Sequence, residues 1–209
     1  MPAPLTPKEI AFVIGERDRS FKRFIDDVGP PPARRSSPVA QRFPTLARAI
    51  TGQLLATKAA TTIHQRVVDL CDGDVSAVAI QRAGHANLRN VGLSNVKAAA
   101  MLDLAERTLD GRVLLAQHGR MSDVDVLRDL VAVRGVGPWT VQMYLMHTLA
   151  RHDVWPAGDF GVRNGWSQLH GLDEMVSEAE LNKLGDLFEG VRSDVAWYCW
   201  HVIRLQRAN

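Results

Sequence analysis

Apolar side chains recur at helical spacing along most of the chain. Between residues 43 and 70 they fall three, four and seven positions apart, and a polar break at Thr57 and Lys58 divides them into two helices that meet near Ala56. These apolar positions are Leu46, Ile50, Leu54, Ile63, Val67 and Leu70. No alternation of polar and apolar residues is long enough for a strand, and no repeat period is visible. The sequence therefore predicts an all-α protein with about ten helices.

Capping residues mark where several of these helices begin. Thr6, followed by Pro7 and Glu9, has the arrangement of an N-cap, a proline at the first helical position and a capping-box glutamate. Residues 29–38 contain four prolines and forbid regular structure, so the first helix is expected to run from Thr6 to about Val28. Further helices are expected at residues 94–111, 122–135, 138–150, 160–169, 177–188 and 193–207, with Ser94 and Ser122 as N-caps.

The composition is that of an ordinary globular protein. Of the 209 residues, 46% are hydrophobic and 23% charged, which excludes disordered and collagen-like classes. The 25 Lys and Arg residues nearly balance the 23 Asp and Glu residues, giving a net charge of +2. No apolar run approaches the roughly 18 residues of a membrane span, and the first residues, MPAPLTPKEI, lack the layout of a signal peptide. We therefore expect a cytoplasmic protein without membrane association.

Cysteine and histidine spacing limits the metal chemistry that the chain can support. Cys71 and Cys199 stand far apart, so the chain builds neither a disulfide scaffold nor a four-thiolate zinc or iron–sulfur site. The seven histidines show no zinc-binding spacing. We expect two buried thiols, no Fe–S cluster and no cofactor in catalysis.

A tight turn between two predicted helices carries the first functional signal. In the segment 130–143 (LVAVRGVGPWTVQM), Gly135 and Gly137 flank one apolar residue and let the backbone take positive φ, and Pro138 then starts a new helix. This pattern predicts a helix-hairpin-helix. The second helix of such a motif directs unpaired backbone N–H groups at an anion such as a DNA phosphate, although an αα-corner that binds nothing has the same pattern.

A second segment, some twenty residues further on, makes the functional interpretation of the turn more specific. Residues 154–163 (VWPAGDFGVR) place Asp159 at the start of the next predicted helix. Together, the two segments resemble the helix-hairpin-helix DNA glycosylase superfamily, and most of all its 3-methyladenine DNA glycosylase II family, over about Phe43 to Leu205. The resemblance implies one catalytic unit of two helical lobes with a cleft between them. We expect lobe A at residues 1–42 and 165–209, and lobe B, with Asp159, at residues 43–164.

The same resemblance assigns roles to single residues. Asp159 matches the catalytic carboxylate that also caps the next helix. Leu54, in the segment 48–55 (RAITGQLL), matches the apolar wedge that enters the minor groove, with Gln53 beside it. Trp139 and Trp200 match the aromatic walls of the base pocket, and Met143 stands where some members carry tyrosine.

Contacts with the DNA backbone and with a cation are implied around the hairpin. The backbone contacts are expected at Arg134, Gly135, Val136, Gly137, Thr140 and Lys58. The carbonyl groups of Val131, Val133 and Val136 are expected to hold a structural Na⁺ or K⁺. Members that also cut the DNA strand carry a lysine where this chain has Trp139, so we expect an intact abasic site as the product.

These residue types suit the removal of alkylated purines. Alkylation makes the base a cationic leaving group that needs little acid catalysis, so a carboxylate at Asp159 has only to stabilise the positive sugar and to orient or deprotonate water. The base must first be rotated out of the duplex, and Leu54 would fill the gap. The electron-rich faces of Trp139 and Trp200 favour a cationic base.

Each assignment has a simpler alternative. Asp159 can be an N-cap alone, and Leu54 can be ordinary helix core. The sequence predicts a monomeric, monofunctional glycosylase that excises 3-methyladenine and 7-methylguanine from damaged duplex DNA, at the bacterial nucleoid or in a eukaryotic nucleus. A glycosylase for deaminated or mismatched bases, or a non-catalytic DNA-binding module, are the alternatives.

The remaining aromatic and basic residues are given structural roles. Trp155, Trp166 and Trp197 are expected to pack in the core, and Tyr144, one residue past Met143, to face away from the base pocket. Between residues 17 and 48, eight basic residues stand against three acidic ones, a local excess of 8 − 3 = +5. A solvated face is the default explanation of such a run. Arg163 lies closer to the expected DNA surface but can instead be bound by a carboxylate.

Overall fold

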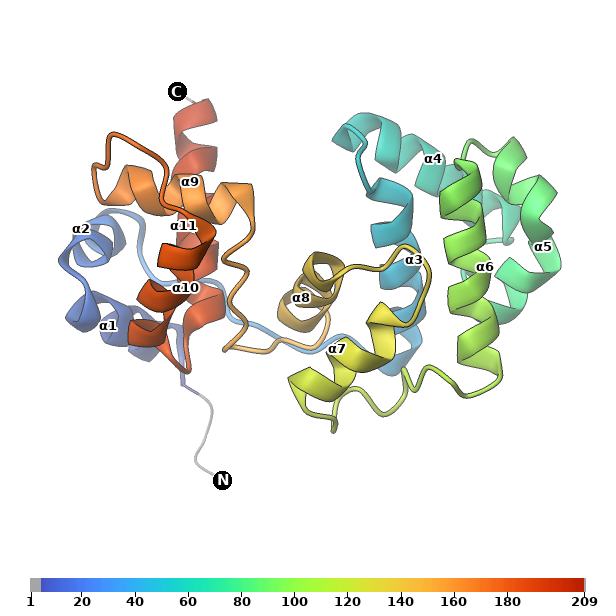
Figure 1. Ribbon diagram of the computed structural model, residues 1–209, viewed down its shortest axis with the longest axis horizontal. Coiled ribbons are helices and arrows are strands. Elements are labelled where there is room, and N and C mark those ends of the chain that lie inside the picture. The colour runs from blue at the N-terminus through green and yellow to red at the C-terminus, as the bar shows by residue number, and fades with distance from the viewer. Residues whose placement is uncertain (1–4, 209) are drawn as a thin grey trace. The chain divides into compact units, whose positions relative to one another are not determined.

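The computed structural model describes residues 5–208, and these are helical through most of their length (Figure 1). No strand occurs in that range, as the hydrophobic pattern predicts. None of its helices is long and apolar enough to cross a bilayer. The helices are α1 Pro7–Arg17, α2 Arg19–Val28, η1 Val39–Gln41, α3 Arg42–Gly52, α4 Thr57–Leu70, α5 Ala77–Asn90, α6 Asn95–Leu109, α7 Asp123–Val131, α8 Pro138–His147, α9 Phe160–Leu169, α10 Glu178–Gly185, η2 Asp186–Phe188 and α11 Arg192–Ala208.

The chain divides into two compact units, one of residues 1–35 with 150–209 and one of residues 36–149. In the first unit α11 lies against α9, and α1, α2 and α10 surround it (Figure 1). Its core is aromatic, because the fully buried ring of Phe21 meets those of Trp166, Phe188 and Tyr198 edge-on. The α9–α11 crossing is close, since a Cβ at Gly165 would collide with the carbonyl oxygen of Cys199.

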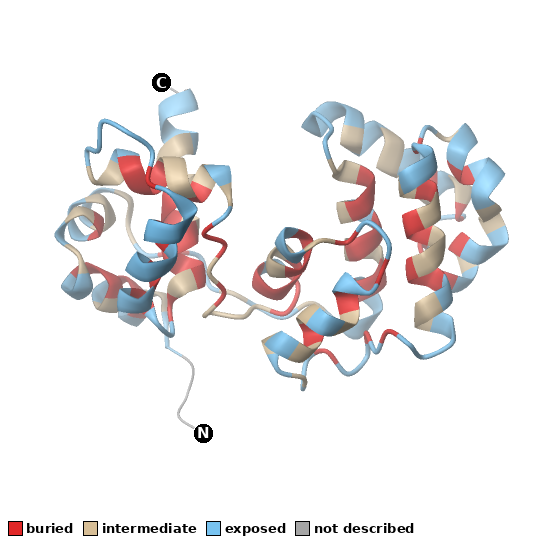
Figure 2. Ribbon diagram, in the orientation of Figure 1, coloured by how far each residue is buried: buried red, intermediate tan, exposed pale blue. Residues whose placement is uncertain are grey.

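The second unit contains η1 and α3 to α8. Buried positions recur along α3 and α6 (Figure 2), and the apolar face predicted for residues 43–70 contributes Leu46, Ile50 and Val67 to its core. Cys71 is buried here, and Cys199 is buried in the first unit; both are free thiols, as the sequence predicts. Burial raises the pKa of each thiol, and each is therefore protonated at neutral pH.

The helix boundaries differ from the prediction where a polar residue or glycine interrupts the pattern. The predicted helix 6–28 breaks at Asp18, which is extended and accepts hydrogen bonds from the N–H groups of Ser20 and Phe21 (2.7 and 3.0 Å), so it caps α2. The helix α5 was not predicted, and it bends at Gly84, where φ is 69°. The predicted helix 122–135 ends earlier, at Val131. Thr6, Ser94 and Ser122 are N-caps, as predicted.

The two units also differ from the predicted lobes. The boundaries fall after residues 35 and 149, whereas the sequence placed them after residues 42 and 164. Residues 150–164, with Asp159, therefore belong with the terminal helices and not with the hairpin. The physical reason is that this segment leads into α9, whose main packing partner is α11.

A buried ion pair between Arg34 and Asp194, in the first unit, holds the proline-rich linker, residues 29–38, in place. Arg34 Nε donates to Asp194 Oδ1 (2.8 Å) and its Nη2 donates to the carbonyl of Ser193 (2.9 Å). Both side chains are almost fully buried. Arg42 is buried too, in the second unit, where its Nη1 donates to the carbonyl groups of Leu115 and Ala116. The basic run at residues 17–48 is therefore not a uniform solvated face.

Replacing Arg34 with methionine is expected to lower the free energy of unfolding by about 3–5 kcal/mol, because it leaves the buried Asp194 carboxylate without its guanidinium partner. Urea unfolding followed by circular dichroism measures this. Arg35→Met is the matched control, since Arg35 is exposed and follows directly in the chain. An equal decrease in the free energy of unfolding in the two variants would contradict the structural role of the Arg34–Asp194 pair.

Candidate functional site

The predicted hairpin is present between α7 and α8 in the second unit. Gly135 has φ of 72°, whereas Gly137 has φ of −95°, so only the first glycine takes the left-handed conformation. Pro138 is the first residue of α8, as predicted, and its N-cap Gly137 provides no side-chain hydrogen bond. The N-terminal amide groups of α8 thus have no side-chain cap, which is the arrangement that anion-binding helix ends use.

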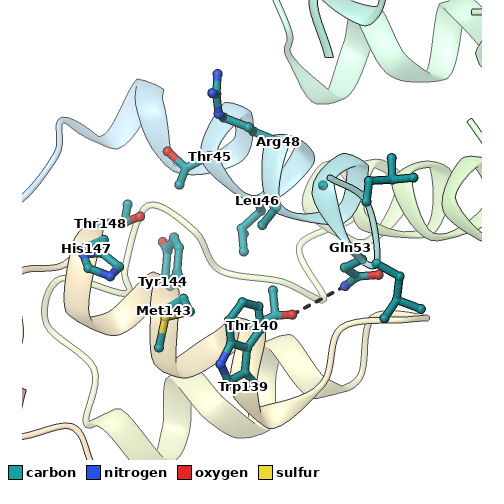
Figure 3. Close-up of a pocket in the computed structure, with 14 residues that line it drawn as sticks. Thr45, Leu46, Arg48, Gln53, Trp139, Thr140, Met143, Tyr144, His147 and Thr148 are labelled. Carbon is teal, nitrogen blue, oxygen red and sulfur yellow. Dashed lines mark hydrogen bonds between the residues drawn. The ribbon is translucent and has the colours of Figure 1, made fainter. Parts of the chain in front are cut away.

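Two neighbouring helices hold the hairpin backbone in place. From α6, Asp103 Oδ2 accepts the backbone N–H of Arg134 (2.7 Å). From the end of α3, Gln53 Nε2 donates to the carbonyl of Gly135 (2.9 Å) and lies 3.5 Å from Thr140 Oγ1, as Figure 3 marks. The Gln53 amide, predicted as part of the wedge, therefore bonds the hairpin and positions it against α3.

Leu54 combines an unusual backbone conformation with a fully exposed apolar side chain. It follows the end of α3 with φ of 56°, and its side chain is fully exposed, with a relative accessibility of 104%. A branched residue in the left-handed region costs roughly 1–2 kcal/mol, and an exposed leucine recovers none of it by burial. The alternative that Leu54 is helix core is therefore wrong, and its role as a wedge stays a prediction.

A groove of about 540 Å³ lies between α3 and α8, within the second unit. Trp139, Met143 and His147 follow one another along one face of α8 and line it, with Thr45 and Leu46 opposite on α3 (Figure 3). Trp139 is half exposed. The lining is mainly apolar, as the lining of a ligand-binding pocket usually is.

Tyr144 also lines this groove, contrary to the expectation that it faces away. Its ring is buried, and its hydroxyl lies 3.1 Å from Nδ1 of the buried His118, whose Nε2 is 2.6 Å from Asp129 Oδ2. Burial raises the pKa of Tyr144, so the phenol stays neutral. The groove floor is thereby fixed by a chain of hydrogen bonds.

Asp159 lies in the first unit, at the start of α9. It is the N-cap of that helix, as predicted, and its Oδ1 accepts the backbone N–H of Val162 at 2.9 Å. The same oxygen accepts the indole N–H of Trp200, from α11, at 2.8 Å. The carboxylate is partly exposed and held by two donors from two helices. The contact with Trp200 was not foreseen, because the two residues are 41 positions apart in the chain.

The other predicted contact residues divide into exposed and buried ones. The Lys58 and Arg134 side chains are exposed, whereas Thr140 and Val136 are 5% exposed. Because the Thr140 and Val136 side chains are buried, the DNA contacts predicted at these two positions would be made by their backbone groups. Arg163 Nε donates to the carbonyl of Val176 (2.8 Å), where a carboxylate was one expectation.

The tryptophans outside the predicted pocket have packing roles, as expected. Trp155 Nε1 donates to the carbonyl of Leu181, Trp166 stacks on His170, and Trp197 stacks on His201.

The carbonyl groups proposed for a cation come from the turn after α7. Val131 ends the helix, and Val133 accepts the N–H of Val136 at 3.1 Å. Carbonyl oxygens retain a second lone pair and are hard donors of the kind that alkali cations take, so the donor type suits Na⁺ or K⁺, and the cation itself stays a prediction. Across residues 5–208, no three His, Cys, Asp or Glu side chains gather into a metal site.

Comparison with known proteins finds DNA glycosylases of similar sequence and fold. The chain is 29% identical over 191 residues to DNA-3-methyladenine glycosylase 1 of Schizosaccharomyces pombe, covering 90% of this chain and 84% of that protein. The structure of the 3-methyladenine DNA glycosylase of the same yeast in complex with abasic DNA is similar, with a TM-score of 0.82 and 29% identity over 91% of this chain and 94% of that one.

A DNA-3-methyladenine glycosidase structure from Bacillus halodurans shares the fold, with a TM-score of 0.84 and 24% identity over 98% of this chain and 92% of that one. The model of the HhH-GPD superfamily matches residues 47–189, which include the hairpin and Asp159. The chain therefore belongs to the HhH-GPD superfamily of base excision DNA repair proteins.

Proposed function

We propose that this protein is a monofunctional DNA glycosylase that rotates alkylated purines, of the 3-methyladenine and 7-methylguanine type, out of duplex DNA and hydrolyses their N-glycosidic bond. The observation that carries the proposal is the Asp159 carboxylate, partly exposed at the start of α9 and fixed through Oδ1 by Val162 and Trp200. The names of the similar yeast proteins support the choice of substrate.

The chemistry assigned to Asp159 needs no strong acid. As the bond between C1′ and the purine nitrogen breaks, its electron pair passes to the cationic base, which leaves neutral. The sugar becomes positive, and the carboxylate stabilises that charge in place of water. Water then adds to C1′ and gives up a proton, with Asp159 orienting the water or accepting the proton. The products are the free base and an abasic site.

DNA recognition is assigned to the second unit. The uncapped N-terminus of α8 and the side chains of Arg134 and Lys58 contact phosphates, and Leu54 enters the duplex where the base has left. Because Gln53 and Asp103 fix the hairpin backbone, the phosphate site and the wedge keep a constant separation. A Na⁺ or K⁺ ion on Val131, Val133 and Val136 would add positive charge beside the phosphate.

The base itself is assigned to the groove between α3 and α8. The half-exposed face of Trp139 attracts a cationic ring, at roughly 0.5–2 kcal/mol per contact. Met143 offers a flexible thioether in place of a rigid ring, which tolerates more than one base. Trp139 also occupies the position of the lysine used by strand-cutting members, so the DNA strand stays intact. We expect the protein to act as a monomer on damaged duplex DNA.

Release of bases from defined duplexes tests the proposal. Oligonucleotide duplexes that each carry one 7-methylguanine, hypoxanthine or uracil are incubated with the protein, and strand breaks are read before and after alkali. We expect 7-methylguanine to be released fastest, with breaks only after alkali. Faster release of hypoxanthine or uracil would favour the deaminated-base alternative, for which the flexible Met143 leaves room. Binding without release of any base would leave only a DNA-binding module.

A further inference from the structure

The hydrogen bond between Trp200 and Asp159 points to a role for Trp200 that stacking does not explain. The indole N–H donates to Asp159 Oδ1 at 2.8 Å, on the oxygen that already caps α9. We propose that Trp200 is a positioning residue for Asp159, and that Gly161 is the residue whose missing side chain makes room for it. This inference rests on the proposed function, because it concerns the geometry of the proposed catalytic carboxylate.

An N-cap alone does not fix a carboxylate. The terminal torsion of aspartate is broad, so a single bond from the Val162 N–H limits the rotation of the carboxylate without setting one angle. A second donor that approaches the same oxygen from α11 removes that freedom. Electrostatic stabilisation of a developing charge depends on such preorganisation, since the group then needs no reorganisation during the reaction.

The helix α11 that carries the indole is held firmly against α9. Trp200 follows Cys199, whose backbone packs directly against Gly165 of α9, and Tyr198 donates its hydroxyl to the carbonyl of Gly29 at 3.0 Å. The two helices that carry Asp159 and Trp200 therefore cross at a fixed distance. The hydrogen bond is a consequence of that crossing and not of a flexible side chain reaching across.

Gly161 is the second, independent observation. A Cβ at this position would lie 2.8 Å from Trp200 Cδ1, 3.0 Å from its Nε1 and 3.1 Å from Asp159 Oδ1. Gly161 is in the first turn of α9 and does not take positive φ, so the backbone does not require glycine there. Alanine is the better helix former by about 1 kcal/mol. The glycine is explained by the space that the indole and the carboxylate occupy.

The decisive variant is Trp200→Phe, which keeps an aromatic face but removes the N–H donor. Two quantities are measured: the single-turnover rate of 7-methylguanine release at saturating enzyme, and the Kd for a duplex with 2′-fluoro-7-methyl-dG, whose glycosidic bond resists cleavage. We expect the rate to fall about tenfold to a hundredfold, the effect of losing a hydrogen bond to a charged group. The Kd is expected to stay within about twofold of wild type, since the phosphate and wedge contacts are untouched.

Trp197→Phe is the matched control, because Trp197 lies on the same helix as Trp200. Its ring stacks on His201, with ring centroids 4.7 Å apart, and the structure shows no hydrogen bond between Trp197 and Asp159. This control is expected to release base at the wild-type rate. If Trp200→Phe weakens the Kd and leaves the saturated rate unchanged, Trp200 is a stacking wall and the inference is overturned. Equal rates for both tryptophan variants overturn it as well.

Gly161→Ala tests the same geometry with the indole N–H present. We expect a loss of rate similar to that of Trp200→Phe, at unchanged Kd, because the added methyl displaces the ring from the carboxylate. Thermal unfolding confirms that each variant is folded, and a wild-type rate in folded Gly161→Ala overturns the inference. Failure of the wild-type protein to release 7-methylguanine would instead contradict the proposed function, so the two failures are distinguishable.

Discussion

Replacing Asp159 with asparagine is expected to slow base release by at least about a hundredfold, the usual contribution of a well-placed carboxylate, while the fold stays intact. Asparagine is isosteric with aspartate and caps helices equally well. Its Oδ1 can still accept the N–H groups of Val162 and Trp200, so the substitution removes the charge and keeps both of these hydrogen bonds. Single-turnover release of 7-methylguanine measures the rate, and urea unfolding measures the stability.

Comparing Asp159→Ala with Asp159→Asn separates the N-cap from the charge. The alanine variant removes both, and we expect the same loss of rate together with a loss of about 1 kcal/mol in the free energy of unfolding, the cost of a missing N-cap. DNA binding should persist in both variants, because the hairpin and Leu54 belong to the other unit. Near-normal turnover by Asp159→Asn would show that the residue is only an N-cap and would remove the proposed mechanism.

The elements that were predictable from the sequence are those set by local chemistry. Thr6, Ser94 and Ser122 cap helices because a side-chain oxygen reaches a backbone N–H three residues later, and this is readable from neighbours in the chain. The hairpin was predictable for the same reason, since Gly135 and Pro138 fix the turn themselves. Asp18 shows the limit, because the apolar pattern on both sides of it predicts one continuous helix, whereas its side chain caps a new helix.

What was missed depends on contacts between distant segments. The division of the chain follows from α9 packing against α11, which no local pattern expresses. The family resemblance places Asp159 and Trp200 in one site but implies a stacking role for the indole. The 2.8 Å hydrogen bond follows from the crossing of two helices, which the sequence does not express. One signal was available: Gly161, a glycine in the first turn of a helix, marks a close approach by another group.

Replacing Leu54 with alanine is expected to weaken binding to a duplex with an abasic site about tenfold to a hundredfold. A leucine side chain that becomes buried gains about 1.5–3 kcal/mol, which corresponds to that range of Kd. The free energy of unfolding should change by less than about 0.5 kcal/mol, because the side chain is fully exposed and buries nothing in the free protein. Fluorescence anisotropy with abasic and undamaged duplexes measures the Kd.

Leu54→Gly should lose as much DNA affinity and yet gain stability. At φ of 56° leucine is strained and glycine is not, so the free energy of unfolding is expected to rise by up to about 1 kcal/mol after the greater entropy of the unfolded glycine chain is subtracted. Opposite effects on stability and binding at one position would show that the strained, exposed conformation exists for the ligand. The rate of base release is also compared between a duplex and an unpaired site, because only the duplex presents a gap to fill. If both variants lose the same fraction of the wild-type rate on the two substrates, Leu54 does not act as a wedge.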